Sequence, residues 1–183
     1  MLANLRALFG VVVDIVLMRR GPEQLPASTV LLAAVVALSI IESSFMAFVA
    51  PVSLPAAFLQ ALVGAAVLLL WFRAALGIAG KPERFTQTMT GIFGVNVLFT
   101  PAMLPLLGAL MPYMEKADPK NQPPGALVIV TLLIGVWALV VYVRIVRVAF
   151  DCPWVIAFLL VVAEFFAGVV ISSMLFGEAP NPG

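Results

Sequence analysis

Five polar residues stand inside long apolar stretches of the sequence: Glu42, Gln60, Asn96, Thr100 and Glu164. Carboxyl and amide groups at such positions can bind a proton or a cation, or can hydrogen-bond neighbouring helices to one another. If each stretch crosses a bilayer as a helix, a rise of about 1.5 Å per residue places all five about 15–20 Å from the inner face. They could therefore meet in one buried polar layer.

The two glutamates decide the chemistry of this layer. A charged carboxylate at such a depth is costly, because the hydrocarbon core does not solvate it. The sequence places no lysine or arginine at the same level. We therefore expect both carboxyl groups to be protonated, or to be hydrogen-bonded to Gln60, Asn96, Ser43 or Ser44. We favour a layer that joins helices or contacts a partner protein. The alternative is a proton or cation site at Glu42 and Glu164.

The composition indicates a protein whose solvent is lipid. The chain is 63% hydrophobic and 10% charged, whereas soluble domains average about 45–50% and about 25%. A net charge of +1 argues against nucleic acid as a partner, because nucleic acid selects a concentrated basic surface. The lipid bilayer is the first partner that the composition predicts.

Several kinds of catalytic and metal chemistry lack their residues. The sequence has no histidine and one cysteine, which argues against histidine-ligated haem, zinc sites of Cys and His, and intrachain disulfides. The serine pairs at 43–44 and 172–173 have no base at their depth, and Asp14 and Asp151 lie near the surface. We therefore predict no catalytic residue, no metal and no cofactor, and a protein that is not an enzyme.

Five apolar stretches are long enough to cross the membrane as helices, since about 20 residues span the hydrocarbon core. The sequence places them at Ser28–Val49, Leu54–Ile78, Thr86–Met111, Ala126–Val148 and Pro153–Phe176. The predicted fold is an all-α, polytopic membrane bundle. Its parts are an N-terminal helix (1–20), a linker (21–27), the five-span bundle (28–176) and a short tail (177–183).

Cations gather at the span ends that share one side of the membrane, and such ends are usually cytoplasmic. On that side lie Arg6, Arg19, Arg20, Arg73, Lys81, Arg84, Arg144 and Arg147, whereas Lys116 and Lys120 lie on the other. This distribution predicts a cytoplasmic N-terminus, an external C-terminus and a location in the inner (cytoplasmic) membrane. We treat six of the residues on the cytoplasmic side as topology anchors: Arg19, Arg20, Arg73, Arg84, Arg144 and Arg147.

The first twenty residues are too short to span. Ala3, Ala7, Gly10 and Asp14 recur at helical spacing and give a narrow stripe of small and polar side chains on an apolar helix. This pattern favours a helix lying along the inner membrane surface, anchored by arginines. A helix packed beneath the bundle fits the pattern equally well.

The third span contains residues that weaken a helix. Pro101 and Pro105 each deprive a carbonyl of its usual donor, so we expect a kink or a split near Thr100. The simpler interpretation is a kink that lets an uneven bundle pack. The alternative is a broken helix lining a cavity, as in transporters, but the sequence shows neither a matching break nor an internal repeat. Gly91 and Gly94 in the same span permit close approach of a neighbouring helix.

Three segments together suggest a family. The corner "RRGPEQLP", the loop and span "GKPERFTQTMTGIFGVNVLFTPAMLPLL", and the late segment "VWALVVYVRIVRVAFDCPWVIAFLLVV" resemble the Yip1 family in its short bacterial form. The resemblance implies five spans after a short cytoplasmic N-terminal helix. Eukaryotic relatives act in vesicle traffic and contact small GTPases through a long N-terminal region, a role that we do not transfer to this chain. The family brings no catalytic residue.

These patterns predict a non-catalytic integral membrane protein. We expect an accessory, assembly or scaffold subunit that binds other membrane proteins, lipids or its own copies through its helix faces. The alternative is a small transporter or channel that uses Glu42, Glu164 and the interrupted third span.

Overall fold

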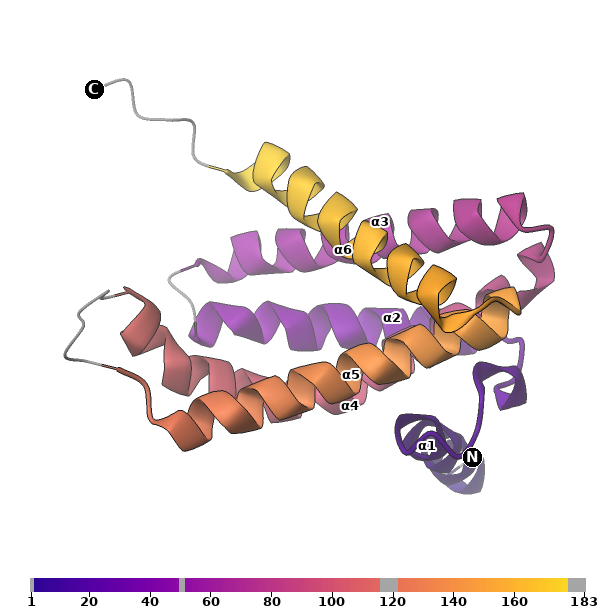
Figure 1. Ribbon diagram of the computed structural model, residues 1–183, viewed down its shortest axis with the longest axis horizontal. Helices are drawn as coiled ribbons and strands as arrows, with labels where there is room; N and C mark the ends of the chain where they lie inside the picture. The colour runs from indigo at the N-terminus through magenta and orange to yellow at the C-terminus, as the bar shows by residue number, and fades with distance from the viewer. Residues whose placement is uncertain (1, 50–51, 116–121, 178–183) are drawn as a thin grey trace.

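The computed structural model describes the backbone at residues 2–49, 52–115 and 122–177 and the side chains at 8–49, 52–114 and 122–177. Every regular element in this part of the chain is helical (Figure 1). The α-helices are α1 (Leu2–Val16), α2 (Thr29–Ser44), α3 (Leu54–Ile78), α4 (Phe85–Glu115), α5 (Gly125–Phe150) and α6 (Trp154–Phe176). Short 3₁₀ turns form η1 (Pro22–Gln24), η2 (Phe45–Phe48) and η3 (Pro82–Arg84).

Five of the described helical segments are long and apolar enough to cross a membrane, as the sequence predicts. They are Thr29–Phe48, Leu54–Ile78, Pro82–Met114, Gly125–Phe150 and Trp154–Phe176. Serine caps fix two of the starts, because the Ser28 and Ser53 hydroxyls accept the backbone N–H groups of Leu31 and Ala56. Each predicted stretch corresponds to one helix, with ends that differ by a few residues.

The third span does not split at its prolines. Helix α4 continues from Phe85 to Glu115 through Pro101, Pro105 and Pro112, so a split near Thr100 is wrong. Proline fixes φ near a helical value, and a helix can therefore run past it although one hydrogen bond is lost at each site. A kink at these residues stays a prediction.

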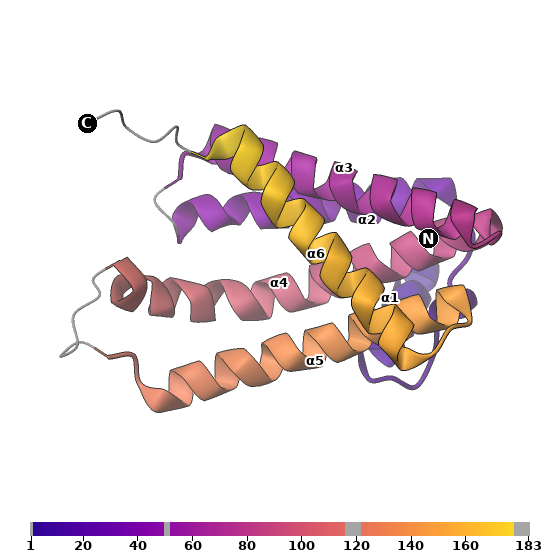
Figure 2. The ribbon, with the colours of Figure 1, turned by 45° about the horizontal axis from the view of Figure 1, so that its top comes forward.

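The five long helices lie side by side, and α1 lies across one end of them (Figure 1). Helix α2 contacts α3 and α4, α6 contacts α3 and α5, and α4 contacts α5, which closes a ring. The α3–α4 and α5–α6 connections share the end that carries α1, which we call the basic end (Figures 1 and 2). The α2–α3 and α4–α5 connections and the end of α6 lie at the opposite end.

The core is concentrated toward the basic end. In α4 the eight residues 88–95 are buried, whereas no described side chain from 96 to 114 is. In α5 burial begins at Val141, and in α6 it ends at Val161. We call residues 96–114, 125–140 and 162–177 the loosely packed half. Figure 2 shows α5 and α6 diverging along it, so these two helices meet tightly only toward the basic end.

Helix α1 is shorter than the predicted N-terminal helix and ends at Val16. The chain then turns through Met18, whose φ of 58° is unusual for a residue with a side chain. The backbone N–H groups of Arg19 and Arg20 return to the Asp14 carbonyl. This turn redirects the chain from α1 toward η1 and the first long helix.

Candidate functional site

The predicted polar layer is only partly assembled. The side chains of Glu42, Asn96, Thr100 and Glu164 are half-buried, and that of Gln60 is exposed. Glu42 belongs to α2, Asn96 and Thr100 to α4, Glu164 to α6 and Gln60 to α3. The prediction of one buried layer therefore needs correction at Gln60. It lies roughly a third of a turn away from the buried face of α3, which contains Ala57, Ala65, Leu68, Phe72 and Leu76.

One member of the layer, Asn96, contacts a residue that sequence reasoning missed. The Tyr142 hydroxyl of α5 donates a hydrogen bond to Asn96 Oδ1 of α4. Tyr142 stands eight residues before the end of α5, which corresponds to a depth of about 12 Å. The depth arithmetic used for the other five would have placed it near Asn96.

Glu42 is the unpartnered member of the layer. Its Oε2 atom is buried and has no hydrogen-bond partner among the described residues. The nearby Ser44 hydroxyl donates instead to the Ile40 carbonyl at 2.7 Å. A buried polar atom without a partner is destabilising, so Glu42 is where a partner helix, a lipid or a proton would act most directly.

Threonines in α4 bond within their own helix. Thr88 and Thr90 donate to the carbonyls of Arg84 and Thr86, each at 2.7 Å. Thr100 shows no side-chain hydrogen bond to another described residue. In the described ranges, no three His, Cys, Asp or Glu side chains gather closely enough to hold a metal ion.

The basic end is built around Asp151, which follows α5 in a left-handed conformation with φ of 49°. Its Oδ2 atom lies 2.9 Å from Lys81 Nζ and 2.7 Å from Arg84 Nη1. Lys81 also donates to the Phe150 carbonyl at 2.6 Å, and Arg84 to the carbonyls of Val148 and Ala149 at 3.1 Å. The two cations thus cap the C-terminus of α5, where positive charge is favourable.

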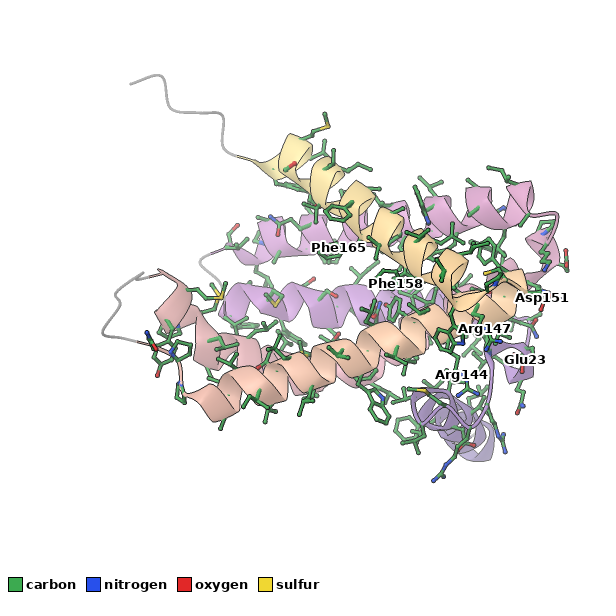
Figure 3. All side chains as sticks on the ribbon, viewed as in Figure 1. Glu23, Arg144, Arg147, Asp151, Phe158 and Phe165 are labelled. Carbon is green, nitrogen blue, oxygen red and sulfur yellow. The ribbon has the colours of Figure 1, made fainter. Side chains whose placement is uncertain are left out.

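Electrostatics at this cap follow from the same contacts. Hydrogen bonds from Lys81 and Arg84 hold the pKa of the Asp151 carboxyl below its ordinary value, because they stabilise its charged form. The side chain of Asp151 is 59% exposed, so solvent screens these pairs. Figure 3 shows Asp151 at the same end as Arg144 and Arg147.

The N-terminal helix is fastened to the bundle at this end. Trp137 Nε1 donates to the Val16 carbonyl at 3.1 Å, and the Arg144 guanidinium donates to the Met18 carbonyl. Gln87 Nε2 donates to the Leu25 carbonyl at 2.8 Å, which fixes η1 against α4. Helix α1 therefore packs on the bundle while lying across its end (Figure 1). Its position at the membrane surface stays a prediction.

Two glycines permit this contact. A Cβ atom added to Gly91 would meet Pro22 at 3.3 Å, and one added to Gly94 would meet Val12 at 3.2 Å. Both distances are shorter than ordinary van der Waals contact. The small residues of α4 therefore make room for the N-terminal segment.

The predicted topology anchors have different structural roles. Arg73 and Arg147 lie over the rings of Phe85 and Trp154, with guanidinium carbons 5.2 Å and 5.3 Å from the ring centroids. Arg20 pairs with Asp14 at 3.0 Å. Arg84 and Arg144 cap or fasten other segments, as described above. Arg19 is exposed and has no side-chain contact of these kinds within the described residues.

Comparison with protein-family models, with curated proteins and with solved structures gives no match for this chain. The resemblance to the Yip1 family therefore stays a prediction from its motifs.

Proposed function

We propose that this chain is a non-catalytic integral membrane protein that serves as an accessory, assembly or scaffold subunit. It binds other membrane proteins, or further copies of itself, through the loosely packed half of its bundle. The observation that carries the proposal is the contrast within single helices. Helix α4 buries every residue from 88 to 95 and none of its described side chains beyond them.

Packing forces explain why this contrast favours a partner. Association of helices in lipid depends on close packing and on interhelical hydrogen bonds. The helices satisfy both requirements at the basic end, but α5 and α6 diverge beyond it (Figure 2). A partner helix seated along the diverging faces would supply the missing packing. It would also lie at the depth of the Asn96–Tyr142 pair and of Glu42.

The proposed orientation places the basic end in the cytoplasm. Arg19, Arg20, Arg84, Arg144 and Arg147 gather there, and cytoplasmic segments carry an excess of such residues. Helix α1 then lies at the inner surface of the membrane. The localisation that follows is a multi-pass protein of the inner membrane with an external C-terminus.

Site-specific photo-crosslinking tests the proposed binding surface. A photoreactive phenylalanine analogue replaces Leu133 of α5 or Phe166 of α6, which are 64% and 60% exposed in the loosely packed half. Matched controls carry it at Val155 (68% exposed) or Ile78 (91% exposed) in the packed half. We expect a discrete protein adduct, or a dimer of this chain, from the first pair alone. Equal crosslinking at all four positions, or lipid adducts only, would contradict the proposal.

One observation supports a transporter or channel as the second candidate. Tyr142 joins α5 to Asn96 of α4 by a hydrogen bond, and Glu164 of α6 lies at a similar level, because each of the three residues is about 12–17 Å from the basic end of its helix. Proton or cation flux into liposomes that disappears in Glu164→Gln, but persists in the exposed-site variant Gln60→Leu, would favour this candidate. Flux indistinguishable from that of empty liposomes would remove it.

A further inference from the structure

A groove on the outside of the bundle combines an apolar channel with one unpaired cation. It runs between α2 and α3 at the basic end and has a volume of about 410 Å³. Its walls are Leu32, Ala33, Val36, Leu69 and Leu70. The groove is also lined by Thr29, Arg73 and the ring of Phe85. The groove is therefore apolar along the helices and polar near the membrane surface.

Arg73 is available to a ligand. Its guanidinium lies 5.2 Å from the centroid of the Phe85 ring, a stacking contact that leaves its N–H donors unused. No Asp or Glu lines the groove, and Arg73 forms no ion pair with any described residue. The hydroxyl of Thr29 adds a further donor on the opposite wall. An anionic group at this position would meet a positive charge with no acid competing for it.

We propose that this groove binds an anionic phospholipid, with its phosphate on Arg73 and Thr29 and one acyl chain along α2 and α3. Arginine matches the geometry of a phosphate group. The apolar walls extend from that point toward the middle of the membrane, as an acyl chain does. This inference deepens the lipid-binding part of the predicted function and rests on membrane insertion with the basic end at headgroup level. It does not require a protein partner.

The groove between α5 and α6 is a weaker candidate for the same ligand. Its apolar part is lined by Val143, Trp154 and Phe158 without any cation. The polar pocket beside it holds Arg147 together with the Asp151 carboxylate, which would repel a phosphate. Of these two grooves, the α2–α3 groove alone combines an apolar channel and an unpaired cation in one lined space.

Lipid titration of the purified full-length chain in detergent, followed by native mass spectrometry, tests the site. The probes are phosphatidylglycerol and phosphatidylcholine with identical acyl chains. We expect a preference for phosphatidylglycerol and an apparent affinity about tenfold lower in Arg73→Gln, the usual effect of losing a charge-assisted hydrogen bond. The control Arg19→Gln removes the same charge from an exposed position at the same end and should leave the affinity unchanged.

A second pair of variants tests the acyl channel without altering charge. Ala33→Phe fills the groove, whereas Ala34→Phe adds the same ring to the neighbouring exposed position of α2, outside the groove. We expect the first to reduce binding of both phospholipids and the second to leave it unchanged. If Arg73→Gln does not purify as a monodisperse helical protein, this pair alone decides the question.

Three outcomes would overturn the proposal. They are equal losses in Arg73→Gln and Arg19→Gln, equal binding by the two phenylalanine variants, and competition by inorganic phosphate as strong as that by the phospholipid. The last outcome would indicate a site for free phosphate. Because the titration uses the isolated chain, its failure leaves the crosslinking test of the accessory function untouched, and the reverse also holds.

Discussion

Tyr142 of α5 donates its hydroxyl hydrogen to Asn96 Oδ1 of α4, and this bond joins two helices at the point where the packed half of the bundle ends. Toward the basic end both helices contribute buried residues, at 88–95 in α4 and from Val141 to Ala149 in α5. At 96–114 of α4 and 125–140 of α5, on the other side of the pair, no described side chain is buried. The pair therefore marks the boundary between the self-sufficient part of the fold and the part that we assign to partners.

Tyr142→Phe removes the donor of this bond while keeping the ring. We expect the free energy of unfolding to fall by about 0.5–2 kcal/mol, the usual range for interhelical hydrogen bonds in membranes. Denaturant titration in mixed micelles measures this change. A double-mutant cycle with Asn96→Ala isolates the pair. Tyr113→Phe is the control at the other tyrosine, and an equal effect there, or no coupling with Asn96→Ala, would contradict the assignment.

Glu42→Leu removes a buried carboxyl oxygen that has no partner among the described residues. An unsatisfied buried polar atom is destabilising, so we expect the isolated chain to gain about 1 kcal/mol in unfolding free energy. Thermal unfolding in detergent measures the change, with the near-isosteric Glu42→Gln as the matched variant. A clear loss of stability in Glu42→Leu would mean that the carboxyl group is satisfied within the chain.

Asp151 gives the basic end a predictable dependence on pH. Hydrogen bonds from Lys81 and Arg84 lower the pKa of its carboxyl in the folded chain, so folding favours the charged form. The resulting stabilisation is present above the ordinary value of 3.8 and is lost as the pH falls through the lower folded pKa. Thermal unfolding between pH 6 and pH 3 should show this loss in the wild type and a smaller one in Asp151→Asn. Glu83→Gln, in the exposed η3 turn, is the control, and identical profiles for Asp151→Asn and the wild type would contradict the prediction.

Gly94→Val tests the docking of the N-terminal helix. Its Cβ would approach Val12 to 3.2 Å, so α1 must move away, at a cost of about 1–3 kcal/mol for such overpacking. We expect faster hydrogen exchange at the backbone of residues 8–16. Gly135→Val is the matched control, because a Cβ at Gly135 meets nothing within 4 Å. Unchanged exchange in Gly94→Val would show that α1 is not held by this contact.

Sequence reasoning predicts the five spans closely because a helix surrounded by lipid needs a long run of apolar residues. Backbone groups in hydrocarbon must bond within the helix, so each span appears as one long apolar stretch. The second stretch, Leu54–Ile78, coincides with α3 at both ends. The third is longer than predicted because α4 continues past Pro112 to Glu115.

The candidate site was less predictable, because depth along a helix does not determine direction around it. Gln60 has the expected depth but lies on the exposed side of α3. Tyr142 was overlooked because its polar atom sits at the tip of an aromatic ring. The role of Lys81 in capping α5 depends on a partner 70 residues away, and no local pattern indicates such a pairing.

Cysteine labelling from outside intact cells is the most direct test of the central claim. That claim is that five helices cross the membrane and that the basic end faces the cytoplasm. Glu83 and Gln122 are exposed at the α3–α4 connection and just before α5. Each is changed to cysteine in a Cys152→Ser background and treated with a membrane-impermeant thiol reagent. We expect Gln122→Cys to react in intact cells and Glu83→Cys to react only after permeabilisation. Reaction of both from the same side would contradict the account.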